Sequence, residues 1–128
     1  VDAVIVTLGG NDMLRGIDPA TSRANLETIL QGITARGLPF LLVSMQAPGN
    51  YGPDYKAEFD AIYPELAAKY GPLPAPAFFG PLLDGSAGPA AVQQWMQADG
   101  IHPDAEGVTK IVAGLGPQVL TLLALAGK

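Results

Sequence analysis

The chain opens with Val-Asp-Ala-Val-Ile-Val-Thr-Leu (residues 1–8), and this stretch decides the fold class. After its second residue it is almost entirely apolar and rich in β-branched side chains, which is typical of a parallel strand covered on both faces. Residues 39–45, which contain Phe-Leu-Leu-Val, indicate a second buried strand. Between the two, Asp18 and Pro19 supply the N-cap and first turn of an amphipathic helix that ends at Gly37. Strand, helix and strand predict a right-handed crossover unit of an α/β protein.

The rest of the chain continues this alternation. Residues 55–70 carry apolar side chains at helical spacing, residues 75–79 are a short apolar stretch that we expect to form a third strand, and residues 90–96 fit a short helix. Asp104 can cap a last helix. The apolar stripe of that helix consists of Val108, Ile111, Val112, Leu115, Val119, Leu122 and Leu123. The pattern predicts a doubly wound parallel sheet with function in the loops beyond the carboxyl ends of its strands.

Composition is consistent with one folded domain and argues against several classes of protein. The chain has 128 residues, of which 48% are hydrophobic and 15% charged, and it contains no cysteine. Thiolate metal sites and cysteine nucleophiles are therefore absent. A formal net charge of −5 argues against a nucleic-acid partner. No apolar run reaches the roughly 18 residues needed to span a bilayer, so we expect no membrane span.

The only histidine of the chain, His102, lies in the sequence Asp99-Gly100-Ile101-His102-Pro103. Histidine is the side chain best suited to proton transfer near neutral pH. Asp99, three positions earlier, can turn back and accept a hydrogen bond from one ring nitrogen, which leaves the other nitrogen free to act as a base. The alternative is an ordinary loop, because Asp, Gly and Pro also gather in turns for conformational reasons.

A second candidate loop, Gly9-Gly10-Asn11-Asp12, follows the first strand. Glycines such as Gly10 let the backbone approach a bound substrate closely, and the side-chain amide of Asn11 can donate to a developing oxyanion. A plain strand-to-loop turn would use the same residues. Asp12 can orient Asn11 or the loop, or simply face solvent.

The three serines are weak candidates for a nucleophile. Ser22 lies in the first turn of the first helix and is expected at the surface, and Ser86 lies in a Gly/Pro-rich loop. Ser44 ends the second strand, but it lacks the Gly-x-Ser-x-Gly elbow that would expose its hydroxyl.

Two further groups of side chains could form a site. Asp12, Asp99 and Asp104 could hold magnesium in a phosphatase, but the chain has neither a Gly-rich phosphate loop nor a cluster of basic residues, so we predict no metal. Aromatic side chains could line an acyl or aryl pocket for substrate, although such residues are more often part of a core. They are Tyr51, Tyr55, Phe78, Phe79 and Trp95.

Together the two loops resemble the SGNH (GDSL) hydrolases. Leu8-Gly9-Gly10-Asn11-Asp12, followed by Leu14-Arg15-Gly16, resembles the third sequence block of that family, and Asp99-Gly100-Ile101-His102-Pro103 resembles the fifth. The segments between them resemble the bacterial lysophospholipase/thioesterase I and arylesterase branch. These segments are Pro48-Gly49-Asn50-Tyr51-Gly52, Ile62-Tyr63-Pro64 and Gln94-Trp95-Met96-Gln97.

The resemblance implies a flavodoxin-like fold and a serine esterase that needs no metal or organic cofactor. His102 would be the base, Asp99 the residue that orients it, Asn11 an oxyanion donor, and Gly10 and Tyr51 substrate-binding residues. The implied substrates are small esters, thioesters or lysophospholipids. A periplasmic or secreted location is favoured by the resemblance alone.

The resemblance also implies that residues 1–128 are the C-terminal portion of a single SGNH hydrolase domain whose first strands are absent from this chain. The family's nucleophilic serine lies in a Gly-Asp-Ser motif, and this sequence has no such motif. We therefore expect the serine on a segment or companion polypeptide that precedes Val1 in the fold. The alternative is a non-catalytic binding or assembly module that a partner chain completes.

Overall fold

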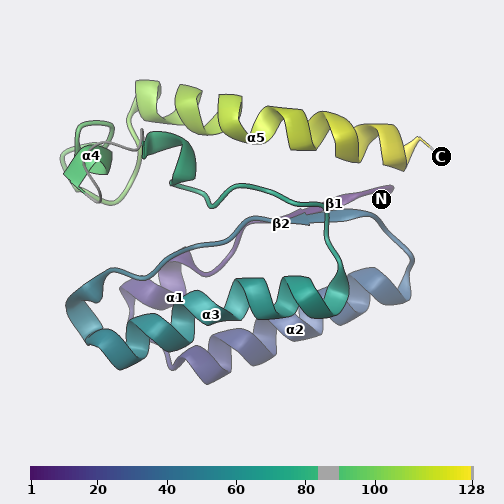
Figure 1. Cartoon of the computed structure of the whole chain (residues 1–128), viewed down its shortest axis with the longest axis horizontal. Coiled ribbons are helices and arrows are strands. Elements are labelled where there is room, and N and C mark those ends of the chain that lie inside the picture. The colour runs from purple at the N-terminus through teal and green to yellow at the C-terminus, as the bar shows by residue number, and fades with distance from the viewer. Residues whose placement is uncertain (84–89, 128) are drawn as a thin grey trace.

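The computed structural model describes residues 1–83 and 90–127, and they form three layers (Figure 1). A small parallel sheet lies in the middle, two long helices cover one of its faces, and one long helix covers the other. The strands are β1 (Val4–Val6) and β2 (Phe40–Leu42), and the long helices are α2 (Pro19–Ala35), α3 (Pro53–Tyr70) and α5 (Ala105–Ala126). The short elements are α1 (Gly10–Leu14), η1 (Gly49–Tyr51), η2 (Gly80–Leu82) and α4 (Ala90–Gln93).

The predicted crossover unit is confirmed. β1 and β2 pair in parallel, with Val4 opposite Phe40 and Val6 opposite Leu42. The side chain of Asp18 accepts a hydrogen bond from the backbone N–H of Ala20 and so caps α2 as expected. The α/β class follows from these elements.

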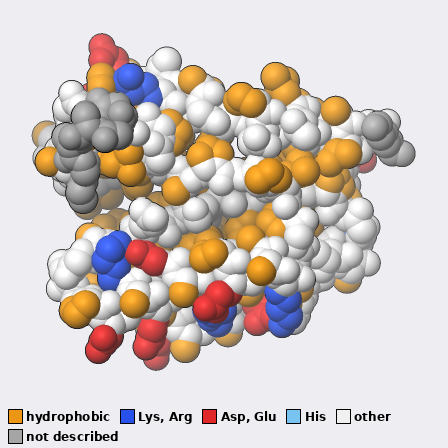
Figure 2. Space-filling view, in the orientation of Figure 1, with side chains coloured by type: hydrophobic (Ala, Val, Ile, Leu, Met, Phe, Trp, Pro, Cys, Tyr) orange, Lys and Arg blue, Asp and Glu red, His pale blue; other side chains and the backbone are white. Residues whose placement is uncertain are grey.

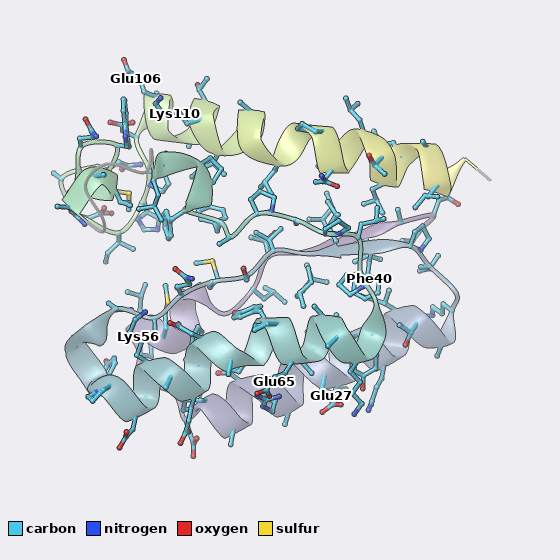
Figure 3. All side chains as sticks on the ribbon, viewed as in Figure 1. Glu27, Phe40, Lys56, Glu65, Glu106 and Lys110 are labelled. Atoms are coloured by element: carbon cyan, nitrogen blue, oxygen red, sulfur yellow. The ribbon has the colours of Figure 1, made fainter. Side chains whose placement is uncertain are left out.

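The core lies between the sheet and the layer of α2 and α3. Leu30 of α2 and Phe59 and Ile62 of α3 have no exposed surface, and Phe40 of β2 packs in the same cluster. Ion pairs between Arg23 and Glu65 and between Lys69 and Glu27 join the two helices at the surface (Figure 3). Such exposed pairs add little stability, so burial of the apolar faces holds this layer together.

The first strand is less buried than its sequence predicts. All three residues of β2 are buried, as expected for a strand covered on both faces. In contrast, Ile5 of β1 is 47% exposed, and Leu8 just beyond it is 50% exposed. The expectation that residues 1–8 are covered on both faces is therefore wrong for this chain.

The third predicted strand, residues 75–79, does not form. The chain follows β2 in the parallel direction with a single bridge between Leu73 and Leu41, and the N–H of Phe78 donates to the carbonyl of Ser44 at 2.9 Å. The reason is the run of prolines at positions 72, 74 and 76, because proline has no N–H to donate to a ladder.

The predicted apolar stripe of the last helix is only partly buried. Asp104 caps α5 by accepting a hydrogen bond from the N–H of Gly107 at 2.8 Å. Ile111 and Leu122 are buried, but Val112 is 61% and Leu123 59% exposed. Figure 2 shows apolar side chains along α5, while charged side chains gather over α2 and α3.

By length and composition alone, α5 could also cross a membrane, a test that core helices of soluble proteins pass as well. The expectation of no membrane span is therefore not confirmed.

Candidate active site

Both candidate loops lie beyond the carboxyl ends of the strands. β1 and β2 run toward the end of the molecule at which α1 and the segment around α4 lie (Figure 1). Asn11 belongs to α1, and Asp99 and His102 follow α4. The fold thus places the predicted residues at the edge of the sheet where α/β proteins bind their ligands.

The predicted hydrogen bond between Asp99 and His102 is present. Oδ2 of Asp99 lies 2.7 Å from Nδ1 of His102. Oδ1 of the same carboxylate accepts hydrogen bonds from the backbone N–H groups of Ile101 at 2.9 Å and His102 at 3.0 Å. The intervening Gly100 has φ +66°, a left-handed conformation that glycine adopts without strain and that closes the turn.

This geometry keeps Asp99 ionised and His102 in one orientation. The hydrogen bond from the His102 ring, followed by those from the two backbone N–H groups, lowers the pKa of Asp99 to about 2. A carboxylate that accepts from Nδ1 holds the proton there, which leaves Nε2 as the basic nitrogen. Among the described residues, none hydrogen-bonds Nε2, and the His102 side chain is 69% exposed. The pair can therefore take a proton from a group that approaches from outside.

The turn that carries the pair is fixed to the start of α5. Gln97 donates its backbone N–H to the carbonyl of His102 at 2.8 Å and its side-chain amide to the carbonyl of Pro103 at 3.0 Å. The carbonyl of Trp95 accepts from the N–H of Asp104 at 2.8 Å. Lys110 places its ammonium 4.4 Å from the centre of the Trp95 ring (Figure 3 labels Lys110).

The second candidate loop forms a short helix, α1, at the end of β1. α1 begins after Gly9, whose φ of +112° is available to glycine but strained for other residues. Asn11 is exposed in this helix. Asp12 does not face solvent freely, because its Oδ2 accepts a 2.6 Å hydrogen bond from the hydroxyl of Ser22. Ser22 has no exposed surface, so the expectation of a surface serine is wrong.

Three tyrosines of η1 and α3 hold the segment around α1 by its backbone. Each donates its hydroxyl to a carbonyl of that segment, and sequence reasoning did not identify this set. The pairs are Tyr63 with Leu8 at 2.7 Å, Tyr51 with Leu14 at 3.2 Å and Tyr55 with Ile17 at 2.8 Å. Tyr55 follows Tyr51 by four residues and Tyr63 follows Tyr55 by eight, so the three lie on one side of α3 and the turn before it. This spacing is the sequence signal that could have suggested the set.

Within residues 1–83 and 90–127, the other candidates make no hydrogen bond to the pair of Asp99 and His102 or to Asn11. Ser44 is partly buried at the end of β2, and Ser86 lies outside the described residues. The three aspartates considered for magnesium each have a partner within the chain: Asp12 binds Ser22, Asp99 binds His102, and Asp104 caps α5.

The predicted substrate-binding residues lie near α1. Gly10 is the first residue of that helix, and Tyr51 is 44% exposed with its ring against Gly16. Their roles toward a substrate stay predictions.

Sequence comparison identifies the family. Residues 1–110 match the GDSL-like lipase/acylhydrolase family. The chain belongs to this family. Esterase TesA of Pseudomonas aeruginosa is 39% identical over 120 residues, a match that covers 94% of the chain and 56% of TesA. Thioesterase 1/protease 1/lysophospholipase L1 of Escherichia coli K12 is 37% identical, with 94% of the chain and 54% of the relative covered.

Solved structures of GDSL-like hydrolases share the fold. AlinE4, an SGNH-hydrolase family esterase, superimposes with a TM-score of 0.66 at 41% identity over 95% of this chain and 61% of AlinE4. The chain spans about half the length of the two relatives named above. The short parallel sheet of two strands is consistent with the α/β fold class.

Proposed function

We propose that this chain supplies the base, its orienting acid and one oxyanion donor of a serine-dependent carboxylic-ester hydrolase. The observation that carries the proposal is the carboxylate of Asp99, which lies 2.7 Å from Nδ1 of His102 and accepts two backbone hydrogen bonds. The nucleophilic serine would come from a segment or companion chain outside these 128 residues.

The proposed reaction uses each of these groups once in acylation and again in deacylation. The serine hydroxyl attacks the carbonyl carbon of the ester while Nε2 of His102 takes its proton, and Asp99 stabilises the imidazolium. The side-chain amide of Asn11 donates to the oxyanion of the tetrahedral intermediate. His102 then protonates the leaving alcohol or thiol. Water attacks the acyl-enzyme with the same base, and the serine is regenerated.

The names of the relatives support esters, thioesters and lysophospholipids as the substrate class. All three present a carbonyl that becomes an oxyanion on attack, so one site can act on them. No cofactor enters these steps. A periplasmic or secreted location is part of the same proposal and rests on the family alone.

A second candidate is a non-catalytic assembly module. The observation that favours it is β1, which pairs only with β2 among the described residues and leaves Ile5 47% exposed. An unpaired apolar strand edge invites pairing with another chain. A partner at this edge is compatible with either function, so hydrolysis decides between them.

The test is complementation. This chain is co-expressed with the part of P. aeruginosa TesA that it does not match, and hydrolysis of a p-nitrophenyl ester is measured for the wild type and for His102→Ala. We expect hydrolysis by the wild-type assembly and a loss of at least a thousand-fold in His102→Ala, because a triad loses most of its rate without the base. Hydrolysis that survives His102→Ala overturns the proposed role of His102 as the base. No hydrolysis in an assembly that forms overturns the hydrolase proposal and favours the assembly module.

A further inference from the structure

The turn between β1 and α1 is built on the hydroxyl of Tyr63. That hydroxyl donates to the carbonyl of Leu8 at 2.7 Å, and the Tyr63 side chain is 2% exposed. A Cβ on Gly9 would lie 1.9 Å from the same oxygen atom, so the backbone passes over the tyrosine at a distance that only glycine permits. Burial raises the pKa of Tyr63, so its hydroxyl keeps its proton and can donate at neutral pH.

A second, partly buried contact holds the other side of α1. Ser22 of α2 has no exposed surface, and its hydroxyl donates to Oδ2 of Asp12 at 2.6 Å. The carbonyl of Asp12 also accepts from the N–H of Ile17 at 3.0 Å, which closes the segment after α1. Hydrogen bonds to a carboxylate are shorter and stronger than those between neutral groups.

Asn11 lies between these two anchors. Leu8 and Gly9 precede it on the Tyr63 side, and Asp12 follows it directly on the Ser22 side. Asn11 itself is exposed, so the core does not pack against its side chain. The backbone on either side therefore sets the position of Asn11 and the direction in which its side chain leaves the helix.

We infer that Tyr63 and Ser22 are positioning residues for Asn11: from α3 and α2 they hold the short helix that aims the Asn11 amide at the oxyanion. The inference rests on the proposed hydrolase function. An oxyanion donor works only where it already points at the charge that develops, and small displacements weaken it. Loss of either hydroxyl should thus lower kcat through Asn11 and leave KM largely unchanged.

The experiment is a double-mutant cycle in the assembly described above. Kinetics with a p-nitrophenyl ester are measured for Tyr63→Phe, Ser22→Ala and Asn11→Ala, and for each of the first two combined with Asn11→Ala. We expect Asn11→Ala to lower kcat by about 100-fold, as for loss of one oxyanion donor. Tyr63→Phe and Ser22→Ala should each lower kcat by about 3- to 10-fold. In the Asn11→Ala background both effects should fall below about 1.5-fold, because residues that act through one group are not additive.

Tyr70→Phe is the matched control. Tyr70 also lies on α3 and donates its hydroxyl to a carboxylate oxygen, that of Glu27 at 2.7 Å, but at the far end of the helix from α1. It should leave kcat unchanged. Thermal unfolding shows whether each variant folds. If Tyr63→Phe does not fold, Ser22→Ala still tests the inference.

The outcomes separate the inference from the proposed function. If Tyr63→Phe and Ser22→Ala lower kcat equally with and without Asn11, they act on the fold in general and the inference is overturned while the hydrolase stands. The same conclusion follows if neither lowers kcat although Asn11→Ala does. If the wild-type assembly does not hydrolyse esters, or if Asn11→Ala is fully active, the proposed roles themselves fail and the inference fails with them.

Discussion

At the residue scale, the pair of Asp99 and His102 combines two kinds of contact in one short turn. The carboxylate binds the imidazole with one oxygen and two backbone N–H groups with the other. The backbone contacts hold the carboxylate in place whether or not the ring is present. The ring contact determines which imidazole nitrogen carries the proton.

The titration of Asp99 should report this arrangement. Its pKa is lowered to about 2, first by the hydrogen bond to His102 and then by the backbone N–H groups. The pairing therefore stabilises the turn fully above the unfolded-state pKa of about 3.9 and is lost as pH falls toward 2. We expect the Asp99 carboxyl carbon signal in NMR to titrate near pH 2, and nearer its ordinary value in His102→Ala. A wild-type midpoint close to 4 would contradict the observed geometry.

Exchange of Asp99 for Asn should damage catalysis without removing the side chain. An amide in place of the carboxylate no longer holds the proton on Nδ1 or stabilises the imidazolium, and in a serine protease triad the equivalent change lowers kcat by about 10⁴-fold. In the assembled enzyme we expect a loss of about 10²- to 10⁴-fold in kcat. Asp54→Asn, an exposed carboxylate on α3, is the matched control and should change kcat by less than two-fold. A fully active Asp99→Asn would exclude Asp99 as the orienting acid.

The sequence predicts those contacts of the site whose two residues lie close together in the chain, and it does not predict the others. Asp99 and His102 are three positions apart with a glycine between them, so local turn chemistry is enough to predict their contact. The contacts of Ser22 with Asp12 and of Tyr63 with Leu8 span 10 and 55 residues. Both contacts depend on how α2 and α3 pack against the rest of the chain. The position of Ser22 in a first helical turn therefore predicts a surface residue, although the structure buries it.

At the element scale, the loop after β2 depends on one ion pair of α3. The carboxylate of Asp60 accepts from the N–H of Ala47 at 2.7 Å, and Lys56, labelled in Figure 3, donates to the carbonyl of Ala47 and to Asp60, each at 2.7 Å. Ala47 is 3% exposed, so both of its backbone groups need these partners.

Removal of the Asp60 carboxylate should therefore destabilise the fold. Asp60→Ala leaves a buried N–H without an acceptor, which costs about 1–3 kcal/mol. Urea unfolding of the chain measures the change in free energy of unfolding. Glu58→Ala, an exposed residue of the same helix, is the control and should change stability by less than about 0.5 kcal/mol. Equal effects of the two changes would show that the Ala47 contacts contribute nothing.

The contact between α5 and the segment that leads into the turn of Asp99 and His102 depends on the absence of a side chain at position 107. A Cβ on Gly107 would lie 2.4 Å from the carbonyl oxygen of Trp95, so Gly107→Ala must push the turn away from the helix. We expect a loss of stability of about 1–3 kcal/mol from this overpacking. Gly32→Ala, in the interior of α2 with no atom near its Cβ, should instead stabilise the chain by about 0.5–1 kcal/mol. Urea unfolding tests both signs, and stabilisation by Gly107→Ala would contradict the close contact.

The elements differ in how well they follow from sequence. α2 has a cap, a first-turn proline and regular apolar spacing, and it forms as predicted. Residues 75–79 have the apolar composition of a strand, but the prolines before and within them leave too few N–H donors for a ladder. The apolar stripe of α5 predicts burial. Burial also depends on which element packs against the stripe, and the sequence of α5 alone does not reveal that element.

At the scale of the whole molecule, the two faces of the sheet are covered unequally. The face under α2 and α3 has a continuous core, whereas on the other side Val112, Leu120 and Leu123 of α5 remain 59–69% exposed and β1 has one free edge among the described residues. An exposed apolar helix face and an unpaired strand edge are each sites for association. Under the proposed function, the partner that binds there is the part of a related hydrolase that this chain does not match.

The last prediction concerns this association. Because a ligand that binds only the folded state stabilises it, the unmatched part of TesA should raise the free energy of unfolding of this chain by about 2.7 kcal/mol at a hundred-fold excess over Kd. Thermal melts with increasing amounts of the TesA segment measure the shift. Ile5→Lys places a charge on the exposed face of β1, next to its free edge, and should abolish the shift, whereas Glu58→Lys on the outer side of α3 should not. If the TesA segment leaves the melting temperature of this chain unchanged, the two do not associate. The hydrolase proposal would then need a different source for its serine.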